Sequence, residues 1–465
     1  MARELFGTDG VRGRAGEFLT AELALALART ATARAERTQD MRPGVLVVRD
    51  TRESGEMLEA AIAAGVTAAG GDALLAGVLP TPAAPMLVRR HALSMAAVIS
   101  ASHNPYEDNG IKLFGSDGFK LDDDTEHAIE AALAEHLAGE SARTGRPAAG
   151  ASRPAAQEIG RVHQLHGALE DYLRELHARF ADLDLSGRRI LLDTAHGATY
   201  EAAPEIFRRL GADVEVLANQ PDGRNINDGC GSTHVETLAE RVRAGDHDLG
   251  FAFDGDGDRV LAVDADGTVV DGDELLALAA VHLHRAGRLP GDGVAVTVMT
   301  NYGFHTAMAS AGVEVATTAV GDRYVLDELR RRGWALGGEQ SGHIMELSFG
   351  PSGDGIAGAL LTLEALGGRD LRERDAMAKL PQRLVNIRAR DREALNETMA
   401  AAALDAAITR ESDALAGRGR VLVRASGTEP LIRVMVEAPS GEETDAVCAR
   451  LADEVRGVLG DARAG

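Results

Sequence analysis

The chain contains few cysteines. Only Cys230 and Cys448 occur among its 465 residues, and they are far apart and outside any Cys-x-x-Cys spacing. Two distant cysteines provide neither a disulfide framework nor a thiolate metal site. We therefore expect both thiols to be buried and inert.

Long apolar runs are also missing. No segment approaches the roughly 20 apolar residues that a membrane-spanning helix needs. Residues 1–13 lack the apolar core of a secretory signal. These two absences predict a cytoplasmic protein that does not span a membrane.

Positive charge is outnumbered by negative charge. The chain has 49 lysine and arginine residues against 72 aspartate and glutamate residues, which gives a formal net charge of −23. Such an acidic surface repels phosphate backbones and anionic lipid headgroups, so neither nucleic acid nor a membrane is an expected partner. Any anionic substrate must meet a local group of cations. Lysine is especially rare, since only Lys112, Lys120 and Lys379 are lysines among the 49 lysine and arginine residues.

The length and the hydrophobic pattern predict several domains. A chain of 465 residues exceeds one domain of the common roughly 100 to 150 residues, which favours three or four. Apolar runs at residues 45–50, 190–193 and 294–299 each end in a polar turn followed by a helix-like segment. Such runs are typical of βα units with buried strands. We expect three similar α/β domains with mixed sheets.

Two polar segments mark the boundaries between domains. Residues 139–156 are rich in Gly, Ala, Pro, Ser and Arg and predict a linker, and residues 367–375 are polar enough for a hinge. The predicted domains are residues 1–140, 157–258, 259–367 and 376–465. The last and smallest should be an α+β domain with strands at 384–389, 421–425 and 431–437 and helices at 392–415 and 442–459.

Familiar phosphate-binding and hydrolase signatures are absent. A Walker A motif needs a Gly-Lys pair, and none of the three lysines follows a glycine. No serine lies in a Gly-x-Ser-x-Gly nucleophile elbow. A nucleophile must therefore be sought in other segments.

An acidic loop follows the apolar run at residues 249–253. Asp254, Asp256 and Asp258 alternate with glycines, so three hard oxygen ligands can converge on one Mg²⁺. An EF-hand is excluded because its sixth and twelfth positions would be Arg259 and Ala265. An acidic surface turn is the alternative, and three aspartates at a strand end favour the metal site.

A serine follows the strand-like residues 95–99. Ser102 is presented beside His103 and Asn104 in a turn stiffened by Pro105. Most Ser-His neighbours are surface turn residues, since adjacent side chains point apart on extended backbone. Lys112 shortly afterwards favours chemistry, because a desolvated lysine can exchange a proton and arginine cannot.

Two further loops carry groups suited to sugar phosphates. Hydroxyls and arginines gather in residues 424–433 and can hold a phosphate, although a Ser-Gly-Thr turn between strands is common. Residues 337–343 present a carboxylate, an amide, a hydroxyl and an imidazole, which can read sugar hydroxyls, but many polar turns would look similar.

Five segments in this order resemble the α-D-phosphohexomutase superfamily over essentially the whole chain. They are FGTDGVRG at 6–13, SASHNP at 100–105, DGDGDR at 254–259, GEQSGH at 338–343 and RASGTEP at 424–430. Gln340, residues 320–325 and Gly427 resemble the branch that acts on glucosamine phosphates. The resemblance implies four domains around a central cleft.

The resemblance also implies a role for each loop. It makes Ser102 the phosphorylated residue and assigns one Mg²⁺ per subunit to Asp254, Asp256 and Asp258 with an oxygen of the Ser102 phosphate. The remaining assignments are Arg12, His103, Lys112 and Arg259 to the reacting end, Glu339, Ser341 and His343 to the sugar, and Arg424, Ser426, Gly427, Thr428 and Arg433 to the other phosphate.

The implied reaction is an isomerisation of a small sugar phosphate. Glucosamine 6-phosphate and glucosamine 1-phosphate would interconvert through a bound 1,6-bisphosphate and feed UDP-N-acetylglucosamine synthesis. Priming of the serine would require that bisphosphate or a kinase. The alternatives are a glucose or mannose phosphate mutase of the same superfamily, a metal-dependent phosphatase, and a sugar-phosphate binding protein. The oligomeric state stays open, a homodimer included.

Overall fold

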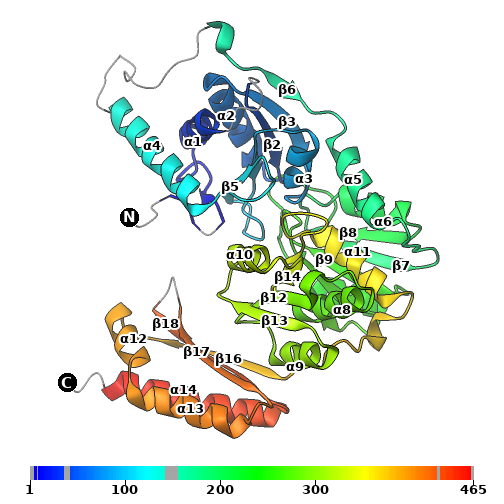
Figure 1. Cartoon of the computed structure of the whole chain (residues 1–465), viewed down its shortest axis with the longest axis vertical. Coiled ribbons are helices and arrows are strands. Elements are labelled where there is room, and N and C mark those ends of the chain that lie inside the picture. Colours follow the sequence, from blue (N-terminus) through cyan, green and yellow to red (C-terminus); the bar gives the residue numbers. More distant parts are fainter. Residues whose placement is uncertain (1–4, 8, 36–41, 142–155, 427–429, 462–465) are drawn as a thin grey trace. The chain divides into compact units, whose positions relative to one another are not determined.

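The computed structural model describes residues 5–7, 9–35, 42–141, 156–426 and 430–461 (Figure 1). The chain forms two compact units. The first comprises Met1–Val298 with Ala316–Arg374, and the second comprises Met299–Val315 with Asp375–Gly465. No helix within the described ranges is both long enough and apolar enough to cross a membrane.

The first sheet of the first unit has six strands. Its order is β1 (Val11–Arg14), β5 (Asp108–Gly115), β4 (Met95–Ile99), β2 (Gly44–Arg49), β3 (Asp72–Val78) and β6 (Val162–Gln164). β2, β3, β4 and β6 are parallel, while β5 and β1 run antiparallel to their neighbours. β4 is buried along its whole length, as expected of a continuous apolar strand in a sheet covered on both faces.

The helices of this first domain are α1 (Ala21–Arg34), α2 (Ser54–Ala68), α3 (Ala83–Arg90) and α4 (Asp123–Ser141). α1 and α2 pack against each other (Figure 1), and α2 also packs on β2 and β3. Thr20 caps the start of α1, since its hydroxyl accepts a hydrogen bond from the Leu23 amide. α4 continues three residues into the predicted linker, and residues 142–155 of that linker lie outside the described ranges.

The second sheet has the order β11 (Val269–Val270), β10 (Val260–Asp264), β9 (Leu249–Phe253), β7 (Arg189–Asp193) and β8 (Asp213–Leu217). A short 3-10 turn η1 (Ala156–Glu158) precedes this region, and its helices are α5 (Ala168–Arg179), α6 (Ala202–Arg209) and α7 (Glu236–Ala244). β9 and β10 are antiparallel neighbours joined by the acidic loop. The boundary predicted after Asp258 therefore falls between two paired strands.

The third sheet has the order β13 (Glu314–Thr318), β12 (Gly293–Thr297), β14 (Leu336–Gly338) and β15 (Ile344–Glu346). Its other elements are α8 (Gly272–Arg285), η2 (Pro290–Asp292), α10 (Asp322–Arg332), α11 (Gly355–Leu366) and η3 (Leu371–Glu373). Asp354 caps the start of α11, since its carboxylate accepts a hydrogen bond of 2.9 Å from the Ala357 amide. The antiparallel connection between β14 and β15 carries the predicted sugar loop.

The second unit is built around one antiparallel sheet. Its order is β16 (Gln382–Arg388), β18 (Leu431–Glu437) and β17 (Arg420–Ala425), and its helices are α9 (Tyr302–Ala311), α12 (Arg392–Met399), α13 (Ala402–Leu415) and α14 (Gly441–Asp461). Glu437 is fully buried and joins α9 to the sheet, since it accepts a hydrogen bond of 2.9 Å from the Tyr302 amide. The predicted architecture of three similar α/β domains and a smaller α+β domain is confirmed.

The single helix predicted over residues 392–415 is wrong, because α12 and α13 are separate. Ala401 has an extended backbone and breaks the run between them. Leu395 and Leu404 are both 1% exposed and belong to the same core. Nine residues turn a straight helix by two and a half turns, which would place these two side chains on opposite faces. The break lets both reach one core.

Both cysteines are free and buried, as predicted. Burial raises the pKa of the Cys230 thiol to about 12, which leaves it protonated and inert at neutral pH.

Candidate active site

The acidic loop between β9 and β10 gathers three carboxylates in the interior of the first unit. Asp254, Asp256 and Asp258 are each no more than 6% exposed. One oxygen from each carboxylate lies within 4.8 Å of the others, and no second cluster of potential metal ligands occurs among the described residues. Gly257 has φ +72°, a left-handed conformation that glycine adopts without a steric cost. The loop can therefore curl its three side chains toward one point.

The electrostatics of this aspartate triad suit a divalent cation. Burial, together with Asp258 and Asp256, raises the pKa of Asp254 well above its usual value. Oδ1 of Asp256 and Oδ1 of Asp258 are buried and accept no hydrogen bond from the described residues. Uncompensated hard oxygens in a buried site are costly, and a Mg²⁺ ion would satisfy them. The residues present therefore fit the cation that the motif predicted.

Ser102 lies directly against the triad. It follows β4 with φ +53°, a conformation that non-glycine residues seldom adopt. Its Oγ donates a hydrogen bond of 2.5 Å to Oδ2 of Asp254 and lies 3.3 Å from Nδ1 of His103. The strained turn therefore presents the serine hydroxyl to the same point at which the carboxylates converge.

Two side chains that the motifs did not indicate hold the backbone of the serine loop. Arg52 is fully buried, and its Nη2 donates to the carbonyl oxygens of Ser102 at 3.1 Å and Asn104 at 2.5 Å. Asn227, from the second domain, donates to the same two carbonyls at 3.0 and 3.1 Å. These two residues form the serine clamp. In the sequence, the only feature that could have drawn attention to Arg52 was its position in a polar turn after a predicted strand. No sequence feature pointed to Asn227.

Ser100 also holds the backbone of the serine loop. Its hydroxyl donates to Asp50 at 2.6 Å and accepts from the Ser102 amide at 2.9 Å. Asp50 in turn forms a buried ion pair with Arg52. Ser100 is thus committed to the loop framework, which leaves Ser102 as the serine with its hydroxyl at the triad.

Lys112, on β5, brings positive charge to the triad. Its Nζ lies 2.8 Å from Asp256 and 3.5 Å from Asp258. Burial alone would lower the pKa of Lys112, but the carboxylates of Asp256, Asp9 and Asp258 raise it above its usual value. Lys112 therefore holds its proton in this arrangement and can neutralise the charge of an incoming phosphate.

The other residues predicted for the reacting end are His103, Arg259 and Arg12. Burial and the neighbouring guanidinium groups of Arg259 and Arg12 lower the pKa of His103 to about 4, so its imidazole is neutral at pH 7. The Arg259 amide donates to Asp254 at 3.2 Å, and its Nε is buried without a hydrogen-bond acceptor among the described residues. Nε of Arg12, on β1, is likewise buried without a hydrogen-bond acceptor among the described residues. Both guanidinium groups are suited to a phosphate oxygen.

The predicted sugar loop reaches the triad at one residue. Nδ1 of His343 lies 3.7 Å from Asp258. Burial alone would lower the pKa of His343, but the carboxylates of Asp258 and Asp322 raise it above its usual value. The Glu339 carboxylate accepts a hydrogen bond of 3.0 Å from the Gly321 amide. Ser341 is exposed. The amide of Gln340 donates to Asp271 at 3.1 Å.

The predicted phosphate loop belongs to the second unit. Arg424 on β17 lies directly opposite Arg433 on β18 in the antiparallel register. Burial and the charge of Arg433 lower the pKa of Arg424, and Nε of Arg433 is buried without an acceptor among the described residues. Facing like charges are destabilising unless an anion lies between them. Ser426 is buried beside this pair, while Gly427 and Thr428 lie outside the described residues.

Four family profiles match successive parts of the chain. They describe the phosphoglucomutase/phosphomannomutase alpha/beta/alpha domains I, II and III, at residues 3–139, 170–267 and 271–384, and the C-terminal domain at residues 384–454. The chain therefore belongs to the phosphoglucomutase/phosphomannomutase family.

Comparison with individual relatives indicates which member of this family the chain resembles. A phosphoglucosamine mutase of Moorella thermoacetica is 49% identical over 96% of this chain and 98% of the relative. Another, of Heliobacterium modesticaldum, is 46% identical over 97% of this chain and 99% of the relative. The resemblance to phosphoglucosamine mutases is thereby confirmed, and the chain is an enzyme of this isomerase type.

Solved structures share the fold. A phosphoglucomutase/phosphomannomutase family protein of Burkholderia thailandensis is 25% identical, with a TM-score of 0.78 over 98% of both chains. An N-acetylphosphoglucosamine mutase of Aspergillus fumigatus, solved in complex with GlcNAc-6P and magnesium, is 18% identical, with a TM-score of 0.67 over 98% of this chain and 96% of that one.

Proposed function

We propose that the protein interconverts glucosamine 6-phosphate and glucosamine 1-phosphate through a phosphoserine at Ser102. The observation that carries this proposal is the 2.5 Å hydrogen bond from the Ser102 hydroxyl to Asp254, inside a buried cluster of three aspartates and several cations. A phosphoryl group on this oxygen would lie against the aspartate triad. The identity with phosphoglucosamine mutases supports glucosamine as the sugar.

The cofactor of this proposal is Mg²⁺, held by Asp254, Asp256 and Asp258. When bound, it neutralises oxygens of the transferring phosphoryl group. The guanidinium of Arg259, 3.8 Å from Asp258, and the ammonium of Lys112 add charge at the same point, and His103 lies next to the serine oxygen. Phosphoryl transfer needs in-line positioning and charge neutralisation, which these side chains can supply.

Each half-reaction exchanges one phosphorus–oxygen bond for another. The bond from phosphorus to Oγ of Ser102 breaks, and a bond forms to O6 or O1 of the sugar, whose hydroxyl proton leaves as the serine oxygen gains one. The product is the 1,6-bisphosphate. Return of its other phosphoryl group to Ser102 yields the isomer and restores the phosphoenzyme.

Isomerisation requires that a second site accept either end of the sugar. We assign this site to Arg424 and Arg433 with Ser426, Gly427 and Thr428, and the sugar hydroxyls to Glu339, Ser341 and His343. The facing guanidinium groups can bind a dianionic phosphate by charge and hydrogen bonds, and such contacts do not depend on which sugar carbon bears the phosphate. The bisphosphate can then bind in two orientations.

The test is phosphorus NMR of the phosphorylated protein with Mg²⁺ and glucosamine 6-phosphate. We expect the glucosamine 1-phosphate signal to appear without free phosphate, and Ser102→Ala to abolish it. Ser310→Ala, at an exposed position of α9, is the matched control and should retain activity. Stoichiometric release of inorganic phosphate would identify a phosphatase instead, and binding without conversion would identify a sugar-phosphate binding protein.

A further inference from the structure

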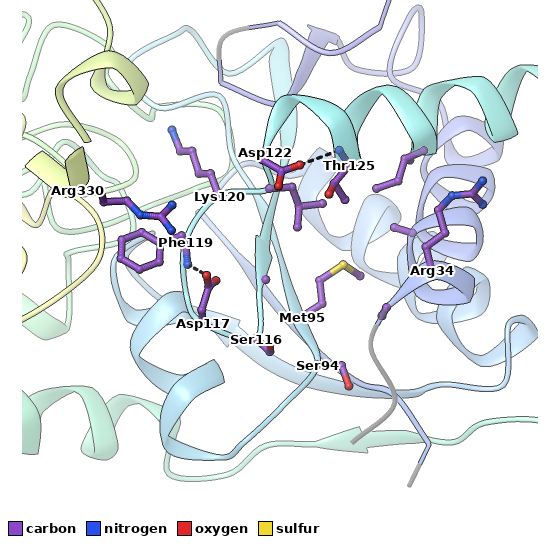
Figure 2. Close-up of a pocket in the computed structure, with 15 residues that line it drawn as sticks. Arg34, Ser94, Met95, Ser116, Asp117, Phe119, Lys120, Asp122, Thr125 and Arg330 are labelled. Carbon is purple, nitrogen blue, oxygen red and sulfur yellow. Dashed lines mark hydrogen bonds between the residues drawn. The ribbon is translucent and has the colours of Figure 1, made fainter. Parts of the chain in front are cut away.

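Lys120 is one of only three lysines, and none of the motifs accounts for it. It lies in the turn between β5 and α4 and borders a cavity of about 520 Å³ together with Arg34, Met95 and Arg330. Figure 2 shows its amine extending away from Asp122 and Thr125. The Lys120 side chain also borders a second cavity of about 400 Å³, which it shares with Asp322 and His343.

The ammonium group of Lys120 joins two carboxylates that are distant in sequence. Nζ donates to Oδ2 of Asp322 at 2.5 Å and to Oδ1 of Asp9. The Lys120 side chain is only 14% exposed, and the two carboxylates are 20% and 22% exposed. Burial and the charge of Asp9 would raise the pKa of Asp322, but the charges of Lys120 and His343 hold it below its usual value. Without a cation between them, these two groups would repel each other.

Asp9 contacts Lys112 as well as Lys120. Its Oδ2 lies 3.2 Å from Nζ of Lys112 and also forms an ion pair with Arg12. Lys112 in turn contacts Asp256 at 2.8 Å. A continuous series of alternating charges thus runs from Lys120 to one member of the aspartate triad.

Asp322 begins a second series of alternating charges. Nε2 of His343 lies 3.8 Å from Asp322, and Nδ1 of the same ring lies 3.7 Å from Asp258. Asp322 also follows Gly321, whose amide donates to the Glu339 carboxylate at 3.0 Å. The second series therefore ends at another member of the triad, Asp258, and passes through the predicted sugar loop at His343.

We propose that Lys120 is a positioning residue for phosphoryl transfer, which holds Asp9 and Asp322 and through them sets Lys112 and His343 against the aspartate triad. This inference rests on the proposed function. A lysine fits the role because its compact ammonium can donate to two carboxylates on different sides, whereas the planar guanidinium of arginine favours one bidentate partner.

Lys120 is not the only residue that joins the first domain to the third. Arg323, on α10, forms an ion pair of 3.0 Å with Glu126 on α4. The guanidinium of Arg330 lies 4.6 Å from the centre of the Phe119 ring, a contact visible in Figure 2. These contacts join the same two domains without involving Lys120, so its replacement should leave a folded protein.

The experiment compares Lys120→Met and Lys120→Arg with the wild type, and uses Lys379→Met as the matched control at an exposed lysine. Rates are measured with glucosamine 6-phosphate and are divided by the fraction of protein that carries phosphoserine, determined by intact mass. Misplacement of catalytic groups can cost about 10²-fold in rate. We expect kcat to fall by about that factor in Lys120→Met, with KM changed less than about threefold.

Charge retention should rescue part of the loss, so Lys120→Arg should be faster than Lys120→Met, and Lys379→Met should match the wild type. A wild-type kcat in Lys120→Met, or a rise in KM alone, would overturn the positioning role. If Lys120→Met does not fold, Asp322→Asn provides the test, and an unchanged kcat there overturns the role equally. A wild-type protein that does not isomerise the substrate would instead refute the proposed function.

Discussion

Replacement of Asn227 by glycine tests whether the serine clamp orients the nucleophile. Asn227 itself has φ +59°, so glycine keeps the backbone conformation while removing the amide. The variant loses the hydrogen bonds of 3.0 and 3.1 Å to the Ser102 and Asn104 carbonyls. Arg52 still donates to both oxygens, so neither carbonyl is left without a partner.

The size of the effect follows from those contacts. Two hydrogen bonds contribute about 1 kcal/mol each, so the free energy of unfolding should fall by about 2 kcal/mol. The left-handed conformation of Ser102 costs about 1–2 kcal/mol, and the clamp offsets this cost. If all of the lost energy had held Ser102 in place, kcat would fall by up to about 30-fold, since 1.4 kcal/mol corresponds to a factor of ten.

The assay combines isomerisation kinetics with urea denaturation. Asn225→Gly is the matched control, because Asn225 lies in the same loop but its side chain bonds to Gln220 and Asp222 instead of the serine loop. The control should keep the wild-type kcat. A kcat within twofold of wild type in Asn227→Gly, combined with lower stability, would show that the clamp does not orient Ser102.

Three other predictions concern the cation, the titration of a buried carboxyl group and priming. Chelation of divalent cations should stop turnover, and Asp256→Asn should weaken Mg²⁺ binding by at least about tenfold in calorimetry, because an amide cannot replace one of three carboxylate charges; full activity in chelator would contradict the metal assignment. Burial raises the pKa of Asp354 to about 6 from its usual 3.8, so the folded state gains protons first and stability should fall by up to about 3 kcal/mol as pH rises from 4 to 6. Asp354→Asn retains a helix-capping side chain and should flatten that slope in urea denaturation, and an unchanged slope would assign it to other groups. Protein stripped of phosphate should be inert toward glucosamine 6-phosphate and should start when a trace of the 1,6-bisphosphate is added, and immediate turnover without bisphosphate or a kinase would rule out the phosphoserine shuttle.

The sequence was sufficient to place the acidic loop and the serine loop in the fold, because each follows a recognisable strand. The run at residues 249–253 is the strand β9, and Asp254 begins the loop that the alternating glycines predicted. The run at residues 95–99 is the strand β4, three residues before Ser102. Local pattern was sufficient there, because strand ends and turn residues depend on neighbouring positions.

The supporting residues could not be predicted in the same way. Asn227 is 125 residues from Ser102 in sequence, and Lys120 is 202 residues from Asp322. No local period or turn signal reports a contact between domains. The break between α12 and α13 was missed for a related reason, because helix-forming residues continue through Ala401 and only the shared core of Leu395 and Leu404 requires the interruption.

The burial of Glu437 bears on how this chain can be divided. Residues 299–315 lie between two segments of the first unit but belong to the second, where the Tyr302 amide and the Arg420 guanidinium both contact Glu437. The backbone therefore passes between the units at three points. Cleavage after Arg374 would separate α9 from Glu437, which accepts the hydrogen bond of the Tyr302 amide. The C-terminal region is thus no separable module, and an intact first unit would require excision of residues 299–315 as well.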